Sequence, residues 1–247
     1  MINPMELTGK HVLITGGSSG IGRACAIQAS RLGAKVTIIA RNEDKLKETL
    51  FLMDNEKEHA YYLKDLSDIS SIENLVKTIV LERGSIDGFV HAAGIGNPRM
   101  LKDSKYSYVN KMFKIHTFAF IEIVRCLWLK DNLNEFASSV GISSVAAEKG
   151  NKSQNIYAAA KGAMNSFVRP AALELSKRHI RINTVGFAMV DTDMYQEFLD
   201  TGGDIKVMEK QCLGLIDVEN AANNIMYLLS DTSKYITAAN LPVYAGY

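Results

Sequence analysis

Short apolar runs and longer amphipathic stretches alternate along almost the whole of this 247-residue chain. The runs VLIT and VTIIA are apolar on both sides, which is typical of parallel strands buried on both faces. Strands that alternate with helices favour a parallel sheet with helices on both faces. We predict strands at 11–15, 35–40, 60–63, 86–91, 137–142, 180–185 and 241–244, and helices at 21–32, 43–55, 69–82, 105–129, 156–178 and 218–229.

The chain has the length of one α/β domain, and nothing in its composition divides it. It contains four prolines and no repeat or low-complexity tract, so we treat residues 1–247 as one domain. The segment 191–215 breaks the rhythm between a predicted strand and the last predicted helix, and it contains Gly202 and Gly203. Because long segments without a strand are often functional, we predict a substrate flap there. A surface helical excursion without a role is the alternative.

Charge and cysteine usage narrow the partners and the compartment. The 28 basic and 27 acidic residues leave a net charge of +1, so we expect that the protein binds neither nucleic acid nor a membrane surface. Residues 1–10 lack the apolar core of a signal peptide, and no apolar run approaches the roughly 18 residues that span a bilayer. Cys25, Cys126 and Cys212 have no metal-binding spacing. We therefore expect a cytoplasmic protein without a metal site.

A glycine-rich turn directly follows the first predicted strand. Glycine permits positive φ and lets backbone N–H groups approach a pyrophosphate closely. The helix that follows offers free N–H groups and the positive end of its dipole to an anion. The order strand, turn, helix therefore predicts a dinucleotide site. Its expected members are Gly16, Ser18, Ser19, Gly20, Ile21 and Gly22.

The spacing of this turn, TGxxxGIG, resembles the fingerprint of the short-chain dehydrogenase/reductase family, which Thr15, Gly16, Gly20 and Gly22 match. The resemblance covers essentially the entire chain. It implies a Rossmann-like, doubly wound, seven-stranded parallel sheet with the cofactor at the carboxyl ends of the strands. It also implies a homotetramer or homodimer. Within the family, the chain most resembles the 3-oxoacyl-(acyl carrier protein) reductase-like members.

Tyr157 and Lys161 lie four residues apart in an alanine-rich stretch, which places both side chains on one face of a helix. A phenol with a pKa of about 10 is a poor acid or base at neutral pH. We expect the neighbouring ammonium and the positive nicotinamide ring to lower that pKa. Lys161 also has donors left for the nicotinamide ribose. The pair therefore predicts proton transfer by Tyr157.

By the same resemblance, the serine thirteen residues before Tyr157 polarises the substrate carbonyl, which selects Ser144. Its neighbour Ser143 is expected to cap the strand end. Where the family has an asparagine that helps to hold a relay water, this chain has His116. Histidine donates, accepts and titrates near neutrality, so we hypothesise that His116 serves in the relay and adds a pH dependence. A helix-packing histidine is the alternative.

Arg41 decides the expected cofactor. No acidic residue ends the second predicted strand and Arg41 follows it at once, which favours NADP(H) over NAD(H) because a guanidinium binds the 2′-phosphate. The alternative is that Arg41 only reaches solvent. The resemblance also assigns cofactor contacts to Asp65, Leu66, Ala92, Ala93, Gly94, Val190 and Thr192.

Two departures from the family pattern affect this site. The sequence His91-Ala92 replaces two asparagines, and we expect the loss of both amides to weaken hydrogen bonding at the strand end. Phe187 and Ala188 replace Pro-Gly, so we expect a loop that is less preorganised without cofactor.

The predicted function is an NADP(H)-dependent reductase or dehydrogenase that interconverts a carbonyl and a secondary alcohol, with a 3-oxoacyl thioester as one candidate substrate. A keto-sugar or another small alcohol is the first alternative, because a fold does not determine a substrate. The second alternative is a catalytically weak, cofactor-binding partner subunit.

Overall fold

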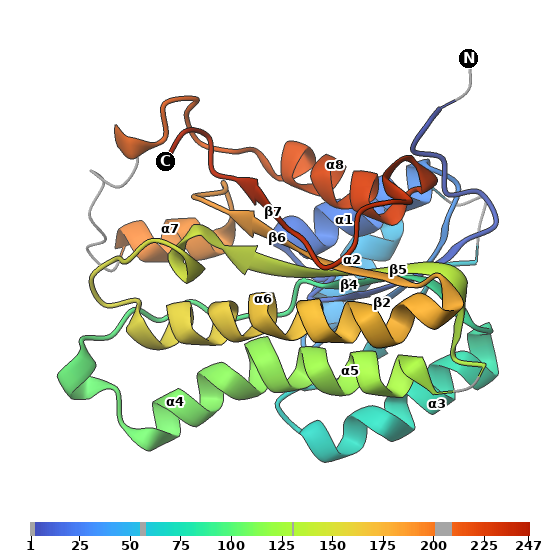
Figure 1. Cartoon of the computed structure of the whole chain (residues 1–247), viewed down its shortest axis with the longest axis horizontal. Coiled ribbons are helices and arrows are strands. Elements are labelled where there is room, and N and C mark those ends of the chain that lie inside the picture. Colours follow the sequence, from blue (N-terminus) through green and yellow to red (C-terminus); the bar gives the residue numbers. More distant parts are fainter. Residues whose placement is uncertain (1–2, 55–57, 130, 201–208) are drawn as a thin grey trace.

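Parallel strands form the sheet at the centre of the molecule (Figure 1). They are β1 (His11–Thr15), β2 (Lys35–Ala40), β3 (Ala60–Leu63), β4 (Ile86–His91), β5 (Leu133–Ser144), β6 (Arg181–Phe187) and β7 (Asn240–Val243). The seven strands are hydrogen-bonded in the order β3-β2-β1-β4-β5-β6-β7. The computed structural model describes residues 3–54, 58–129, 131–200 and 209–247. The predicted doubly wound, seven-stranded sheet is confirmed.

Helices cover both faces of the sheet (Figure 1). They are α1 (Gly20–Arg31), α2 (Glu43–Leu52), α3 (Ile72–Arg83), α4 (Tyr106–Phe113), α5 (Ala119–Trp128), α6 (Asn155–Leu175), α7 (Asp193–Asp200) and α8 (Val218–Leu229). The side chains of β1 alternate between two cores. Val12 and Ile14 join the core under α1, α2 and α8, whereas Leu13 joins the core under α3, α5 and α6.

One predicted helix is continuous over nearly its predicted length but is not α-helical throughout. We expected a single helix over 105–129, but a π-helical turn, Lys114–Phe118, separates α4 from α5. The turn contains the buried His116, and the carbonyl oxygen of its neighbour Ile115 lies 3.1 Å from a ring nitrogen of His91 on β4. A side-chain donor to a helical carbonyl is a recognised cause of such irregularity. The periodicity of the helix does not reveal that the donor, His91, comes from a strand.

The strand order reverses direction between β1 and β4, and the region outside the carboxyl ends of these two strands is called the crevice below. The chain winds from β1 through β2 to β3 at one edge, and then crosses back to β4 on the other side of β1. Open α/β sheets bind ligands outside the carboxyl ends of strands at such a reversal. The glycine turn follows β1 there, and Ser144 ends β5 at the same edge. Within the described part of the chain, no helix has the length and apolar character needed to cross a bilayer.

Candidate active site

The glycine turn after β1 leaves no room for side chains. Gly16 has φ +70° and Gly20 has φ +50°, a region that L side chains rarely adopt. A Cβ on Gly22 would lie 2.2 Å from the carbonyl oxygen of Gly16, and one on Gly16 would lie 2.8 Å from the backbone of Ala92. The N-cap residue of α1, Ser19, makes no side-chain capping bond. The turn therefore presents a tight, open-ended backbone cradle that fits a dinucleotide pyrophosphate.

Arg23 on α1 holds the serine part of this turn. Its Nε and Nη2 donate to the carbonyl oxygen of Ser18 at 3.1 and 2.7 Å, and Nη2 also pairs with Glu48 of α2 at 2.9 Å. The sequence alone does not reveal this role. The arginine lies directly after the GIG motif, but its link to Glu48 joins residues 25 positions apart.

The structure brings Ser144, Tyr157 and Lys161 together beside this crevice. Lys161 is buried, its Nζ donates to the carbonyl oxygen of Ile142 at 2.6 Å, and Nζ lies 5.7 Å from the centre of the Tyr157 ring. The Ser144 hydroxyl accepts from the N–H of Ala146 at 3.1 Å and lies near enough to the Tyr157 phenol to favour its ionised form. These contacts place a hydroxyl, a phenol and an ammonium within one small polar cluster.

The capping role predicted for Ser143 is wrong. The Ser143 Oγ is buried without a hydrogen-bond partner among the described residues. Ser144 instead caps the short 3-10 turn Val145–Ala147 through its bond to Ala146. The alternating pleat of β5 explains the difference, because consecutive side chains of a strand point to opposite faces.

Burial governs the protonation of the cluster. It raises the pKa of the Tyr157 phenol above its usual value, while the hydrogen bond from Ser144 acts in the opposite direction. It also lowers the pKa of Lys161 to about 7. Among the groups present, desolvation outweighs the contacts that favour the phenolate, and the lowering that we expect from the positive nicotinamide ring stays a prediction. In this state Tyr157 holds a proton that it can donate.

Comparison with known proteins identifies the family of the chain. The family profile described as enoyl-(acyl carrier protein) reductase matches residues 16–247. A 3-oxoacyl-(acyl carrier protein) reductase of Pseudomonas aeruginosa is 30% identical over 253 residues, covering 98% of each chain. The chain belongs to the short-chain dehydrogenase/reductase family. It is accordingly an oxidoreductase that acts on CH–OH or carbonyl groups with a nicotinamide cofactor.

Other relatives span the same length. L-xylulose reductase of Caenorhabditis elegans is 28% identical, covering 98% of this chain and 97% of its own. The structure of a glucose/ribitol dehydrogenase of this family from Brucella melitensis is 27% identical, with a TM-score of 0.89 over 98% of this chain and 97% of that one. A blue fluorescent protein from a metagenomic library, solved with NADPH, shares the fold with a TM-score of 0.89 at 24% identity over 98% of each chain.

His116 lies against the tyrosine of this short-chain dehydrogenase/reductase cluster. Its ring meets the Tyr157 ring edge-on, with centroids 5.3 Å apart at 89°. Nε2 lies 3.0 Å from the carbonyl oxygen of Ile95, whereas the buried Nδ1 has no partner in the described part of the chain. Burial and the nearby Lys161 hold the pKa of His116 well below its ordinary value. The expected titration near neutrality is therefore wrong, because this ring stays neutral.

The strand end at His91 is well bonded, contrary to our expectation. One ring nitrogen of His91 lies 3.0 Å from the Thr15 hydroxyl and the other 3.1 Å from the carbonyl oxygen of Ile115. The Thr15 hydroxyl also accepts from the N–H of Ala93 at 3.2 Å. A neutral histidine has a donor and an acceptor, so the single His91 ring bonds neighbours on both sides of this strand end.

The segment after β6 reaches the glycine turn and is held by Gln211. Val190 pairs with Ile216, and the Thr192 side chain lies 3.3 Å from where a Cβ on Gly20 would be. The buried Gln211 accepts from the N–H of Met189 at 2.7 Å and donates to its carbonyl oxygen at 3.2 Å. The sequence alone does not reveal Gln211, because no motif marks a glutamine whose side chain bonds the backbone of a distant residue.

The remaining predicted residues fall into two groups, one after β2 and β3 and the other after β4. Arg41 is exposed directly after β2, and Leu66 is buried after β3. The N–H of Ser67 and, to a smaller extent, Arg41 hold the pKa of Asp65 below its usual value. The backbone of Ala93 and Gly94 lies between Thr15 and His116, where a Cβ on Gly94 would lie 2.7 Å from the His116 ring.

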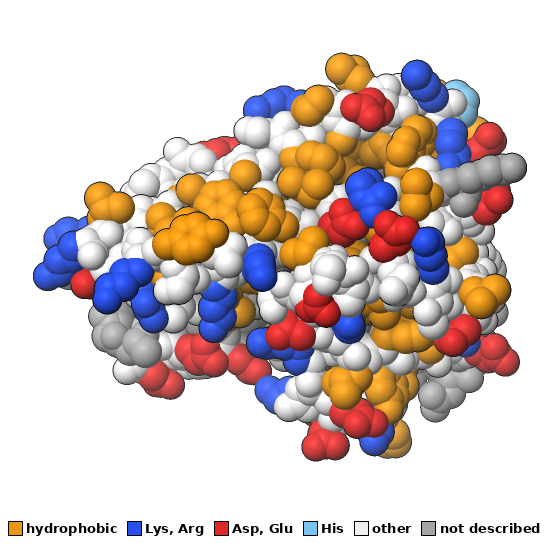
Figure 2. Space-filling model, turned by 90° about the horizontal axis from the view of Figure 1, so that it is seen from below, with side chains coloured by type: hydrophobic (Ala, Val, Ile, Leu, Met, Phe, Trp, Pro, Cys, Tyr) orange, Lys and Arg blue, Asp and Glu red, His pale blue; other side chains and the backbone are white. Residues whose placement is uncertain are grey.

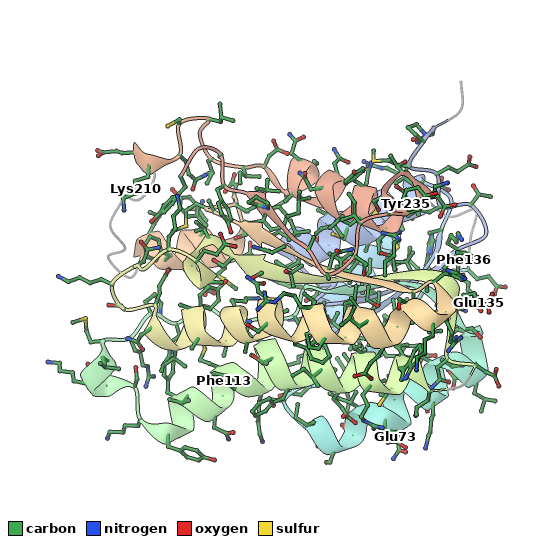
Figure 3. All side chains as sticks on the ribbon, viewed as in Figure 1. Glu73, Phe113, Glu135, Phe136, Lys210 and Tyr235 are labelled. Carbon is green, nitrogen blue, oxygen red and sulfur yellow. The ribbon has the colours of Figure 1, made fainter. Side chains whose placement is uncertain are left out.

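A cluster of potential metal ligands lies far from this site, at Glu73, Glu122 and Cys126. Glu73 projects from α3 on the outside of the molecule (Figure 3). The guanidinium of Arg125 lies 2.6 Å from both carboxylates, and Lys77 lies 2.7 Å from Glu73. These cations already balance the acidic charge, so the cluster is an ordinary surface ion-pair network.

Proposed function

We propose that the protein is an NADP(H)-dependent reductase that converts a carbonyl to a secondary alcohol at Ser144, Tyr157 and Lys161. The observation that carries the proposal is the convergence of these side chains next to the glycine cradle, with the phenol held protonated by burial. A protonated tyrosine is the form that a reductase needs, because the alkoxide formed by hydride addition must receive a proton.

The residues of the chain divide the reaction between them. The bound nicotinamide supplies the hydride that adds to the carbonyl carbon. Ser144 donates a hydrogen bond to the carbonyl oxygen and stabilises its developing charge. Tyr157 transfers its phenolic proton to that oxygen, so the product is a neutral alcohol. Lys161, whose pKa is about 7, can then return a proton to the phenolate at neutral pH.

We assign the preference for NADP(H) to Arg41. Its exposed guanidinium follows β2 without a neighbouring strand-end acid, so it is free to bind a 2′-phosphate by charge and by its fork of donors. Arg41→Asp should reverse the ratio of the Kd values for NADPH and NADH. Arg31→Asp, an equally exposed arginine at the end of α1, should leave the ratio unchanged. An unchanged ratio in Arg41→Asp would refute the assignment.

A 3-oxoacyl thioester is the substrate that we favour, because a 30% identical relative is a 3-oxoacyl-(acyl carrier protein) reductase. The flap also contributes apolar groups, and the Met194 side chain lies 2.9 Å from where a Cβ on Gly96 would be. Oxidation of NADPH with acetoacetyl thioester tests this, with L-xylulose as the second candidate after the 28% identical L-xylulose reductase. Cofactor binding without turnover of any carbonyl in the panel would instead indicate a partner subunit.

We also propose that segment 191–215 covers the substrate and that the protein is a homo-oligomer. In the flap, α7 is described, whereas Gly202, Gly203 and Met208 lie outside the described residues.

Figure 2 shows apolar side chains gathered over the outer helical face. Exposed apolar residues before α4, on α4 and on the π-helical turn that follows it are Leu101, Tyr106 and Phe118. Such a face supports self-association.

The unpaired Cys25, Cys126 and Cys212 support a reducing, cytoplasmic location.

A further inference from the structure

His91 occupies a position where only one arrangement of its protons satisfies the bonds. The side chain is fully buried, and Nε2 lies 3.1 Å from the carbonyl oxygen of Ile115. A carbonyl oxygen can only accept, so Nε2 must carry the hydrogen. The other nitrogen, Nδ1, then accepts from the Thr15 hydroxyl at 3.0 Å. The histidine is consequently the neutral Nε2–H tautomer.

This assignment orients a chain of hydrogen bonds that ends at the cofactor crevice. Because the Thr15 hydroxyl donates to His91, its oxygen is free to accept from the N–H of Ala93, which lies 3.2 Å away. Ala93 is also in contact with the glycine turn, since a Cβ on Gly16 would lie 2.8 Å from the Ala93 nitrogen. His91 thus fixes the hydroxyl that positions the backbone at Ala93.

His116 makes the reciprocal connection in the opposite direction. His91 reaches from β4 to Ile115 in the π-helical turn, and His116, the next residue of that turn, reaches back to Ile95 beyond β4. The 92–95 backbone is therefore tied at both ends, by Thr15 at Ala93 and by His116 at Ile95. The same His116 ring packs edge-on against Tyr157.

We infer that His91 and His116 form a reciprocal brace, and that His91 is a positioning residue for hydride transfer. The brace holds the 92–95 backbone against the glycine turn and fixes the turn that places His116 beside Tyr157. This inference rests on the proposed function, because only in that reaction do the 92–95 backbone and Tyr157 act on the cofactor and the substrate. His91 itself touches neither the phenol nor the lysine through any bond described above; it acts through Thr15 and Ile115.

His11 provides a matched control, because it lies at the amino end of β1, away from the crevice at the carboxyl ends of the strands. It is also buried, and it also links a threonine hydroxyl, Thr37 at 2.8 Å, to the backbone carbonyl oxygens of Gly84 and Ser85 at 3.2 Å. The same reasoning assigns it the other tautomer, because its Nδ1 faces the carbonyl oxygens. Replacing His11 removes the same kinds of bond without disturbing the crevice.

The first experiment compares His91→Leu, His91→Asn and His11→Leu in NADPH-dependent reduction. A small misplacement of reacting groups costs on the order of 10- to 100-fold in rate, so we expect kcat of His91→Leu to fall by about that factor with little change in KM. Thr15→Val should lower kcat in the same direction. His91→Asn, which keeps a donor and an acceptor, should recover part of the loss, and His11→Leu should keep the parent kcat. Equal losses in His91→Leu and His11→Leu, or no recovery in His91→Asn, would overturn the inference.

The second experiment needs no substrate and separates this inference from the proposed function. Long-range ¹H–¹⁵N correlation spectra of the histidine rings report the tautomer directly. We expect Nε2–H for His91 and Nδ1–H for His11, and no titration of His91 between about pH 5 and 8. An Nδ1–H tautomer or a titrating ring at His91 would overturn the brace even if the enzyme reduces carbonyls. Conversely, the predicted spectra with no turnover would refute the proposed reaction while leaving the brace in place.

Discussion

Acid should destabilise this protein in a pH range where its buried histidines, rather than its carboxylates, take up protons. Burial lowers the pKa of His11 to about 4 and that of His91 to about 3, from an ordinary value of 6.5. The folded pKa lies below the unfolded one, so the unfolded chain binds these protons first as the pH falls. Stability is therefore complete above about pH 6.5 and is lost progressively below it.

The size of the effect follows from the two pKa values. At pH 5 each unfolded histidine is almost fully protonated whereas each folded one is neutral, so each contributes a loss of about 2 kcal/mol relative to pH 8. These two contributions add to about 4 kcal/mol for independent sites, and the buried His116 adds to the loss in the same direction. That is a large share of the stability of an ordinary domain.

Urea unfolding at pH 8, 6.5 and 5, at one fixed protomer concentration, measures this loss. His11→Gln should reduce the difference in unfolding free energy between pH 8 and pH 5 by about 2 kcal/mol. Thr37→Val is the control, because it removes the hydrogen bond to His11 but keeps the titrating ring. It should lower stability at every pH and retain the pH dependence. A pH dependence in His11→Gln equal to that of the parent would refute the reasoning.

Two further predictions concern the cradle and the assembly. Gly16→Ala places a Cβ 2.8 Å from the Ala92 carbonyl, so NADPH affinity in a fluorescence titration should fall by at least about tenfold. Gly9→Ala shares a positive φ, +78°, but meets no atom within 4 Å, and it should bind NADPH like the parent; equal affinities of the two variants would contradict the cradle. Phe118→Glu places a charge on the exposed apolar face and should reduce the light-scattering mass to that of a 27.2 kDa protomer. A parent that is itself a monomer, or a variant of unchanged mass, would exclude that face as the interface.

Much of the fold could be predicted because its signals are local. The first four strands are short, mostly apolar runs, and their predicted and observed bounds agree. The glycine turn and the spacing of Tyr157 and Lys161 are also local, since each is contained within a few residues. Chemistry carried by spacing along one element is visible before the structure is known.

The parts that could not be predicted depend on contacts between distant residues. The role of His91 rests on Thr15 and Ile115, which lie 76 and 24 positions away along the chain. The same contacts accompany the π-helical turn that interrupts the predicted helix. The rise that burial causes in the Tyr157 pKa could not be predicted, because it depends on how deeply the phenol lies in the fold, and spacing reveals only its neighbours. The contacts of Gln211 could not be predicted because its partners are backbone atoms.

The central claim is that Tyr157 donates the proton in an NADPH-dependent carbonyl reduction. Its most direct test is the rate of NADPH oxidation with acetoacetyl thioester in the parent and in Tyr157→Phe, with the Kd for NADPH measured in both. Loss of a general acid should lower kcat by roughly 10²- to 10⁴-fold while the Kd stays close to that of the parent. A Tyr157→Phe enzyme that retains the parent kcat on a substrate that the parent reduces would contradict the claim.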